Sequence, residues 1–173
     1  MMPADNMPVL FQRRLADEAA TAALAAQMAP LLRPGDVVAL EGDLGAGKTS
    51  FARAVIRHLA AADEVPSPTF TLVQTYPGHM PLGGDGSLPA EIWHFDLYRL
   101  TRPEQAYDLA IEEAFAEGIS LIEWPDRLGG LLPARRLTIT LTTEKNVAGR
   151  LARVTGDAAW RQRLASFCAR EAE

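Results

Sequence analysis

The sequence has few of the residues that mark secreted, metal-bound or membrane-spanning proteins. Its single cysteine, Cys168, excludes an internal disulfide. The three histidines, His58, His79 and His94, are scattered and follow no zinc-ligand spacing, so we expect them to be structural. No basic segment followed by an apolar one opens the chain, and the apolar stretch 19–32 is shorter than the ~20 residues of a membrane span. We therefore expect a cytoplasmic protein that contacts no membrane.

Basic residues are also outnumbered by acidic ones. The chain carries 17 Lys and Arg against 22 Asp and Glu, which gives a formal net charge of −5 at pH 7. Proteins that hold nucleic acid by bulk charge are basic, so we expect no DNA binding and no binding of RNA through bulk charge, while a local basic patch stays open. Lysine occurs only twice, as Lys48 and Lys145. Lys48 lies in a glycine-rich loop, where a compact point charge suits a phosphate.

The hydrophobic pattern predicts a single α/β domain over residues 1–173. The short β-branched segment 36–41 is typical of a buried parallel strand, and a helix is expected over 48–62. Strands alternating with helices favour a three-layer sandwich with a mixed, mostly parallel central sheet. The other strands are predicted over 9–14, 69–76, 91–98, 119–124, 136–142 and 150–155, and the other helices over 17–32, 103–115 and 157–170.

Two segments are expected to lie outside this framework. Residues 1–8 are predicted to be disordered. Residues 77–90 contain four glycines and three prolines, so they are predicted to form a surface loop at the end of a long hairpin.

The segment Gly42–Thr49 fits the pattern G-x-x-x-x-G-K-[ST] completely and is predicted to be a P-loop that binds Mg-ATP. Glycines allow a tight turn whose N–H groups face phosphate oxygens, and the following helix adds its positive end. Lys48 is expected at the β- and γ-phosphates and the Thr49 hydroxyl at Mg²⁺. The expected nucleotide contacts are Gly42, Asp43, Leu44, Gly45, Ala46, Gly47, Lys48, Thr49 and Ser50.

Two acidic residues end predicted buried strands, where the metal-binding acid of a P-loop protein usually lies. These are Asp96 and Glu123, and each is a candidate for the metal site; the alternative is a surface carboxylate or a helix cap. Thr69 is a candidate hydroxyl that senses the γ-phosphate, although the segment 67–69 also fits a proline-braced entry to a strand.

Four motifs then occur in order: GDLGAGKT at 42–49, VPSPTF at 65–70, HFDLYRL at 94–100 and IEWP at 122–125. The set closely resembles the TsaE (YjeE) family, the ATPase component of the bacterial machinery that makes threonylcarbamoyladenosine (t6A) in tRNA. The resemblance extends from about Leu15 to Val154. Residues 77–90 depart from the usual family pattern.

The resemblance implies roles for individual residues. Glu123 is similar to the magnesium-associated glutamate of the family, and Asp96 to its essential aspartate, which acts on metal or water. Thr69 corresponds to a switch-type threonine. Trp124 resembles a tryptophan beside the nucleotide. Further nucleotide contacts are implied at the start of the first helix, near residues 16–18 with Asp17 at their centre, and at Arg150.

The resemblance also implies partners. TsaE proteins work with TsaB and TsaD, and TsaD performs the carbamoyl transfer. Hydrolysis of ATP by TsaE resets the TsaB–TsaD complex, and it is slow without these partners. Contact with tRNA would then be only indirect, through the complex.

Three other functions remain open on the residues alone. A small-molecule kinase would need an arginine-rich lid, for which 128–136 is a thin candidate. A GTPase is disfavoured, because D-x-x-G at 126–129 has no accompanying N-K-x-D. A nucleotide-dependent binding switch with little hydrolysis is the third.

Overall fold

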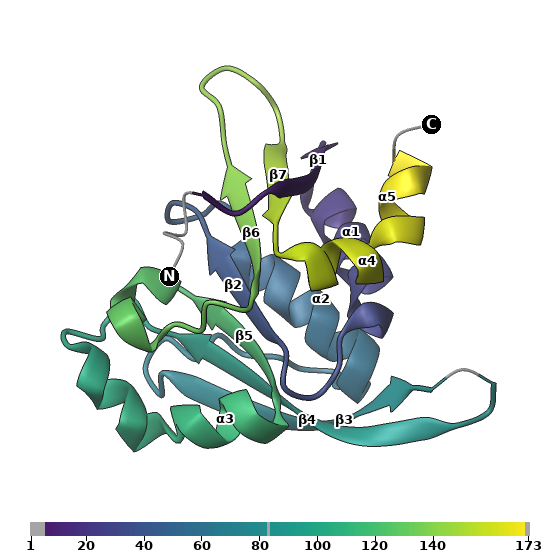
Figure 1. The fold of residues 1–173 in the computed structure, drawn as a ribbon. Coiled ribbons are helices and arrows are strands. Elements are labelled where there is room, and N and C mark those ends of the chain that lie inside the picture. Colours follow the sequence, from purple (N-terminus) through teal and green to yellow (C-terminus); the bar gives the residue numbers. More distant parts are fainter. Residues whose placement is uncertain (1–5, 83, 172–173) are drawn as a thin grey trace.

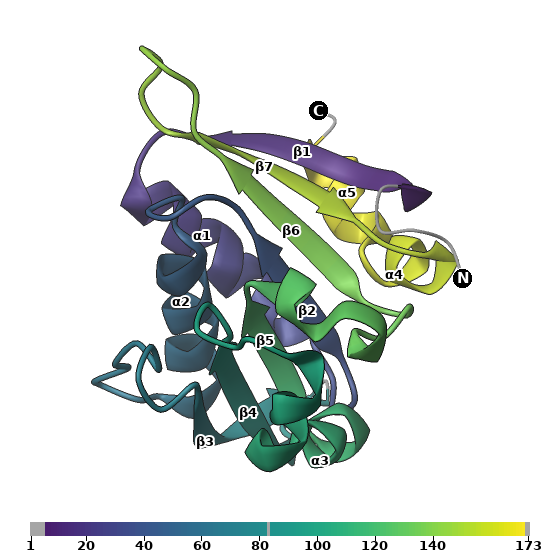
Figure 2. The ribbon, with the colours of Figure 1, turned by 90° about the vertical axis from the view of Figure 1, so that its left-hand side faces the viewer.

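The computed structural model describes residues 6–82 and 84–171. Its centre is a seven-stranded sheet with the order β1-β7-β6-β2-β5-β4-β3 (Figures 1 and 2). The strands are β1 (Val9–Leu15), β2 (Val37–Glu41), β3 (Val73–Pro81), β4 (Ser87–Asp96), β5 (Ile119–Glu123), β6 (Leu137–Thr142) and β7 (Arg150–Thr155).

Parallel pairing is confined to the middle of this sheet. β2 pairs in parallel with both β5 and β6, and β5 pairs in parallel with β4. The outer pairings, β1 with β7, β7 with β6 and β4 with β3, are antiparallel. The prediction of a mixed α/β sheet is confirmed, but the sheet is less parallel than predicted because hairpins and a returning first strand make up its edges.

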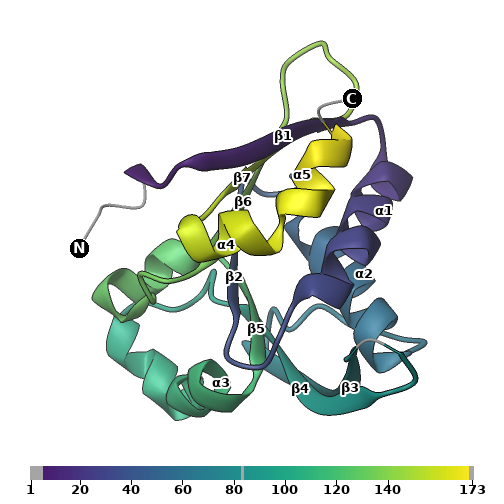
Figure 3. The same ribbon diagram turned by 45° about the vertical axis from the view of Figure 1, so that its right-hand side comes forward.

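Helices cover both faces of the sheet, which makes three layers (Figure 3). One face carries α1 (Glu18–Met28), α2 (Lys48–Ala60), α4 (Ala158–Arg163) and α5 (Ala165–Glu171), which pack on a core that includes Leu121 and Ile119. The other carries α3 (Ile111–Glu117) and the short helices η3 (Pro103–Leu109) and η4 (Pro125–Leu131), around Ile122 and Phe95. Alternate residues of β5 thus face opposite cores, as period-two geometry requires.

The hairpin β3–β4 differs from its prediction. Residues 69–72 form turns rather than strand, and most of the expected loop 77–90 is paired, from Val73 opposite Phe95 to Pro81 opposite Ser87. Prolines are tolerated here for two reasons. β3 is an edge strand, and residues 87–91 of β4 come before Ile92, the first residue of β4 that pairs with β5. The hairpin consequently projects beyond the sheet (Figure 1).

The ends of the chain also refine the predictions. The last helix is broken at Leu164, which leaves the helical conformation between α4 and α5. Of the segment 1–8, residues 1–5 lie outside the described residues. A short 3₁₀ helix, η2 (Ala29–Leu31), ends the first helical segment. No helix in the described part of the chain is long and apolar enough to span a bilayer.

We expect Gly149→Ala to destabilise the protein far more than Gly84→Ala. Both glycines have positive φ, +85° and +64°, so each alanine costs about 1–2 kcal/mol of backbone strain. A Cβ at Gly149 would also lie 2.2 Å from the Leu15 carbonyl oxygen, whereas a Cβ at Gly84 meets nothing within 4 Å. Urea unfolding of both variants measures the difference, and equal losses would contradict the close packing of β7 on β1.

Candidate functional site

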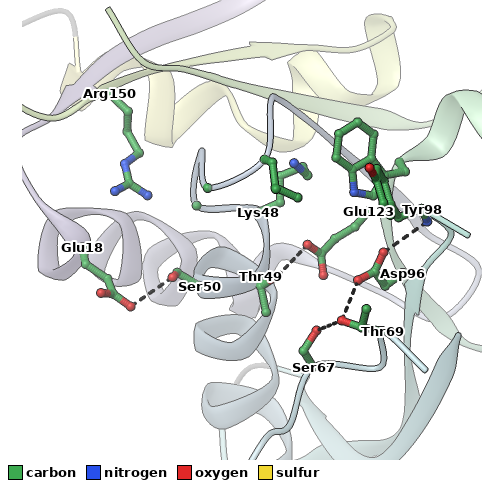
Figure 4. Close-up of a pocket in the computed structure, with 14 residues that line it drawn as sticks. Glu18, Lys48, Thr49, Ser50, Ser67, Thr69, Asp96, Tyr98, Glu123 and Arg150 are labelled. Atoms are coloured by element: carbon green, nitrogen blue, oxygen red, sulfur yellow. Dashed lines mark hydrogen bonds between the residues drawn. The ribbon is translucent and has the colours of Figure 1, made fainter. Parts of the chain in front are cut away.

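A cavity of about 340 Å³ lies where the carboxyl ends of β4 and β5 face the start of α2 (Figure 4). Asp96 ends β4, Glu123 ends β5, and the two residues pair directly in the parallel register. Leu40 of β2 pairs with Glu123 on its other side, and the glycine loop (Gly42–Thr49) follows β2. Parallel pairing therefore brings together side chains separated by up to about eighty positions in sequence.

Lys48, the first residue of α2, is almost fully buried at 4% exposure. Its Nζ donates hydrogen bonds to the carbonyl oxygens of Gly42 at 2.5 Å and Asp43 at 2.9 Å. It also lies 4.2 Å from the centre of the Trp124 ring. Burial lowers the pKa of Lys48, while the nearby carboxylates of Glu123, Asp96 and Asp43 act to raise it. The loop thus folds around an ammonium group at the edge of the cavity.

A glycine is required at position 47 because the Arg150 side chain packs directly against the loop there. Its φ is +106°, and a Cβ built there would lie 1.8 Å from Nη1 of Arg150. The guanidinium of Arg150, the first residue of β7, therefore rests against the loop and lines the cavity from the side opposite Asp96 (Figure 4). A glycine at position 47 allows both the left-handed turn and this close approach.

Glu123 links α2 to β4 through its two carboxylate oxygens. Oε1 accepts a hydrogen bond from Thr49 Oγ1 at 2.6 Å (Figure 4). Oε2 lies 2.8 Å from His94 Nε2. Glu123 is 2% exposed and His94 is fully buried, so this carboxylate is held within the protein with a partner on each side.

Asp96 has a separate set of partners. Its Oδ2 accepts from Thr69 Oγ1 at 3.2 Å, and its Oδ1 accepts from the backbone N–H of Tyr98 at 3.2 Å. Thr69 in turn lies 2.7 Å from the hydroxyl of Ser67 (Figure 4). The turn segment that precedes β3 is thereby tied to the end of β4.

The structure places most of the predicted site residues around this one cavity. Those that line it are Leu44, Gly45, Gly47, Lys48, Thr49, Ser50, Thr69, Asp96, Glu123, Trp124 and Arg150. Gly42 and Asp43 contribute carbonyl oxygens to Lys48 instead, and Ala46 packs in the core. Asp17 has a structural contact, since its Oδ1 accepts from the N–H of Ala20 at 2.8 Å and so caps α1.

Of the residues 16–18 that the resemblance implied, Glu18 lines the cavity and accepts a hydrogen bond from the Ser50 hydroxyl at 3.0 Å. The sequence interpretation overlooked two other residues at the site, Tyr98 and His94. Tyr98 packs its ring 5.0 Å from that of Trp124. His94 was expected only to be structural, yet strand alternation puts it on the same face of β4 as Asp96, two residues away. The spacing of two residues between His94 and Asp96 was the sequence signal that could have placed His94 near the site.

The donors at the cavity suit a hard cation that is only partly held by protein. Carboxylates of Asp96 and Glu123 and the hydroxyl of Thr49 offer oxygen atoms, which Mg²⁺ prefers. Among the residues that the structure describes, no three His, Cys, Asp or Glu side chains form a metal-binding group. A divalent ion here would take its remaining ligands from phosphate and water, so the metal assignment stays a prediction.

Comparison with known proteins gives consistent matches. A family model described as threonylcarbamoyl adenosine biosynthesis protein TsaE matches residues 15–152. The tRNA threonylcarbamoyladenosine biosynthesis protein TsaE of Rickettsia felis is 41% identical over 128 residues, which cover 73% of this chain and 70% of that protein. The Bacillus subtilis protein of the same name is 39% identical over 122 residues, or 70% of each chain.

A solved structure agrees with these sequence matches. The crystal structure of Bacillus subtilis YdiB superposes with a TM-score of 0.69 and 28% sequence identity, covering 94% of this chain and 96% of that one. The similarity therefore includes the sheet and both helical layers, as well as the elements that carry the cavity.

Proposed function

Because the chain belongs to the TsaE family of tRNA threonylcarbamoyladenosine biosynthesis proteins, we propose that it binds Mg-ATP at a P-loop, Gly42–Thr49, and hydrolyses it slowly to ADP and phosphate. The family membership confirms the resemblance drawn from the four ordered motifs. The observation that carries the nucleotide proposal is the position of Lys48. Its ammonium group is almost fully buried and is held at the cavity by the backbone carbonyl oxygens of Gly42 and Asp43.

An anionic ligand would complete this arrangement. Lys48 is desolvated, and a phosphate would supply the compact negative charge that its ammonium binds well. The loop ends at the N-terminus of the 13-residue helix α2, whose free N–H groups and dipole favour anions. Arg150 adds a second cation across the loop. The β- and γ-phosphates of ATP are the expected ligands of Lys48.

The proposed metal site consists of Thr49, Asp96 and Glu123, whose oxygen donors suit Mg²⁺. Bound there, Mg²⁺ would supply positive charge that stabilises the phosphoryl group during transfer. Thr49 and Glu123 already contact each other, which keeps both oxygens at the start of α2.

Asp96 is the proposed residue for holding the attacking water. Each of its oxygens already accepts one hydrogen bond, from Thr69 or from the Tyr98 N–H, and each retains capacity for another. Thr69, next in that chain, is the proposed sensor of the γ-phosphate. A carboxylate that orients water suits slow intrinsic hydrolysis.

Exposed apolar side chains line the cavity or directly follow a residue that lines it, and they support a role for protein partners. Leu44 is 79% exposed and Phe70 82%, and the guanidinium of Arg99 lies 4.6 Å from the centre of the Phe70 ring. Tyr98, which lines the cavity, is also exposed. We propose that TsaB and TsaD proteins dock here and that ATP hydrolysis resets their complex. This protein would then contact tRNA only indirectly, through the TsaB–TsaD complex.

The test is ATP turnover by the purified protein, alone and with the cognate TsaB–TsaD pair. Strong stimulation by the pair would support the proposal. Tight ATP binding without stimulation would favour a nucleotide-dependent switch with little hydrolysis. Phosphate transfer that requires an added small molecule would favour a kinase instead.

We expect Lys48→Ala to weaken ATP binding about a hundredfold, because charge-assisted contacts worth about 3 kcal/mol disappear. The matched control is Lys145→Ala, which removes the other lysine of the chain from an exposed position. Titration with ATP, followed by calorimetry or by the fluorescence of the tryptophans, measures both. Equal affinities in the two variants would exclude Lys48 as a phosphate ligand.

We expect Glu123→Ala to abolish partner-stimulated turnover while the ATP dissociation constant at saturating Mg²⁺ changes by less than about tenfold, because the carboxylate acts through the metal. Glu41→Ala is the control. Glu41 ends the neighbouring strand β2 but accepts a hydrogen bond from Thr140 and does not line the cavity. Near-normal turnover in Glu123→Ala would reject its assignment.

A further inference from the structure

His94 lies in the middle of the protein but beside the candidate site. It is fully buried on β4, and its Nε2 is 2.8 Å from Oε2 of Glu123 on β5. The imidazole lies among apolar side chains on one side, since Ile92 is two residues before it on β4 and Leu121 is its partner in register. A buried polar ring at such a position requires a specific contact to offset its desolvation.

The contact defines which ring nitrogen carries the proton. Nδ1 of His94 is buried and has no hydrogen-bond partner among the described residues. A proton on Nδ1 would therefore remain unsatisfied, while a proton on Nε2 is donated to the Glu123 carboxylate. The surroundings thus select the Nε2–H form of the neutral ring, with the lone pair on Nδ1.

This hydrogen bond limits how the carboxylate can turn. The last torsion of a glutamate is broad, so a carboxylate with a single partner can rotate. Glu123 has a donor on each oxygen, Thr49 from α2 and His94 from β4. The two donors come from different elements of the fold, and together they fix both the plane of the carboxylate and the oxygen that faces Thr49.

We propose that His94 is a positioning residue that orients the Glu123 carboxylate toward the metal-binding hydroxyl of Thr49, an inference that rests on the proposed function. His94 donates to Oε2, so Oε1 is the oxygen presented at the start of α2. The histidine itself does not reach the nucleotide or the metal. Partners of metal-ligating carboxylates act in this way, and their loss typically weakens metal binding tenfold to a hundredfold.

The first test is Mg²⁺ binding to the complex with a non-hydrolysable ATP analogue, measured by calorimetry. We expect His94→Leu to raise the Mg²⁺ dissociation constant at least about tenfold, while binding of the analogue in EDTA changes less than about threefold. His94→Gln keeps side-chain N–H donors and should restore part of the loss. Phe95→Leu is the control, because Phe95 is equally buried on β4 but faces the opposite core.

A double variant separates positioning from general loosening of the core. If His94 acts through the carboxylate, His94→Leu adds no further loss of Mg²⁺ affinity in a Glu123→Gln background. Additive losses in the double variant, or equal losses in His94→Leu and Phe95→Leu, would overturn the proposal.

A second readout needs neither nucleotide nor activity. Two-bond ¹⁵N–¹H correlation spectra of the unliganded protein should show the His94 proton on Nε2, with a resonance that moves in Glu123→Gln. A proton on Nδ1 would overturn the positioning role. Failure of the wild-type protein to bind the analogue, with the Nε2–H pairing intact, would overturn the proposed function, and with it the metal part of this inference.

Discussion

The site depends on the parallel pairing of β5 with β2 on one side and β4 on the other. This pairing places Asp96 opposite Glu123 in register and Leu40 opposite Glu123 on the other side, so the glycine loop begins beside both acids. No local sequence preference could bring these three segments together. A slip of one residue in either pairing would move its carboxylate into the opposite core, where α3 packs.

The charges at this point are mutually dependent. Glu123 is 2% exposed, and a carboxylate so deeply buried is tolerated only with donors and a nearby cation. Thr49 and His94 supply the donors, and Lys48 supplies the charge, since the pull of Glu123 on the lysine opposes the effect of burial on its pKa. Each group thus reduces the cost of burying the others.

Sequence patterns predicted the parts of the site that depend on strand ends and on the glycine loop. Asp96 and Glu123 could be placed because short apolar runs end at them, and carboxyl ends of parallel strands meet at one edge. Within residues 16–18, only the backbone geometry at the helix start shows that Glu18, and not the capping Asp17, lines the cavity. The paired extent of β3–β4 was missed because its glycines and prolines read as loop, whereas main-chain hydrogen bonding at an edge strand tolerates them.

Burial divides the site into two kinds of residue. Asp96 and Glu123 are set by the sheet and are buried, whereas Leu44 and Phe70 are exposed on loops. Thr69 connects the two, since it bonds Asp96 and directly precedes Phe70 in the chain. Under the proposed function, a partner that binds the segment around Phe70 would shift the Thr69 hydroxyl, which donates a hydrogen bond to Asp96. Hydrolysis would then respond to docking through this loop contact, because Thr69 lies on the loop while Asp96 is buried at the end of β4.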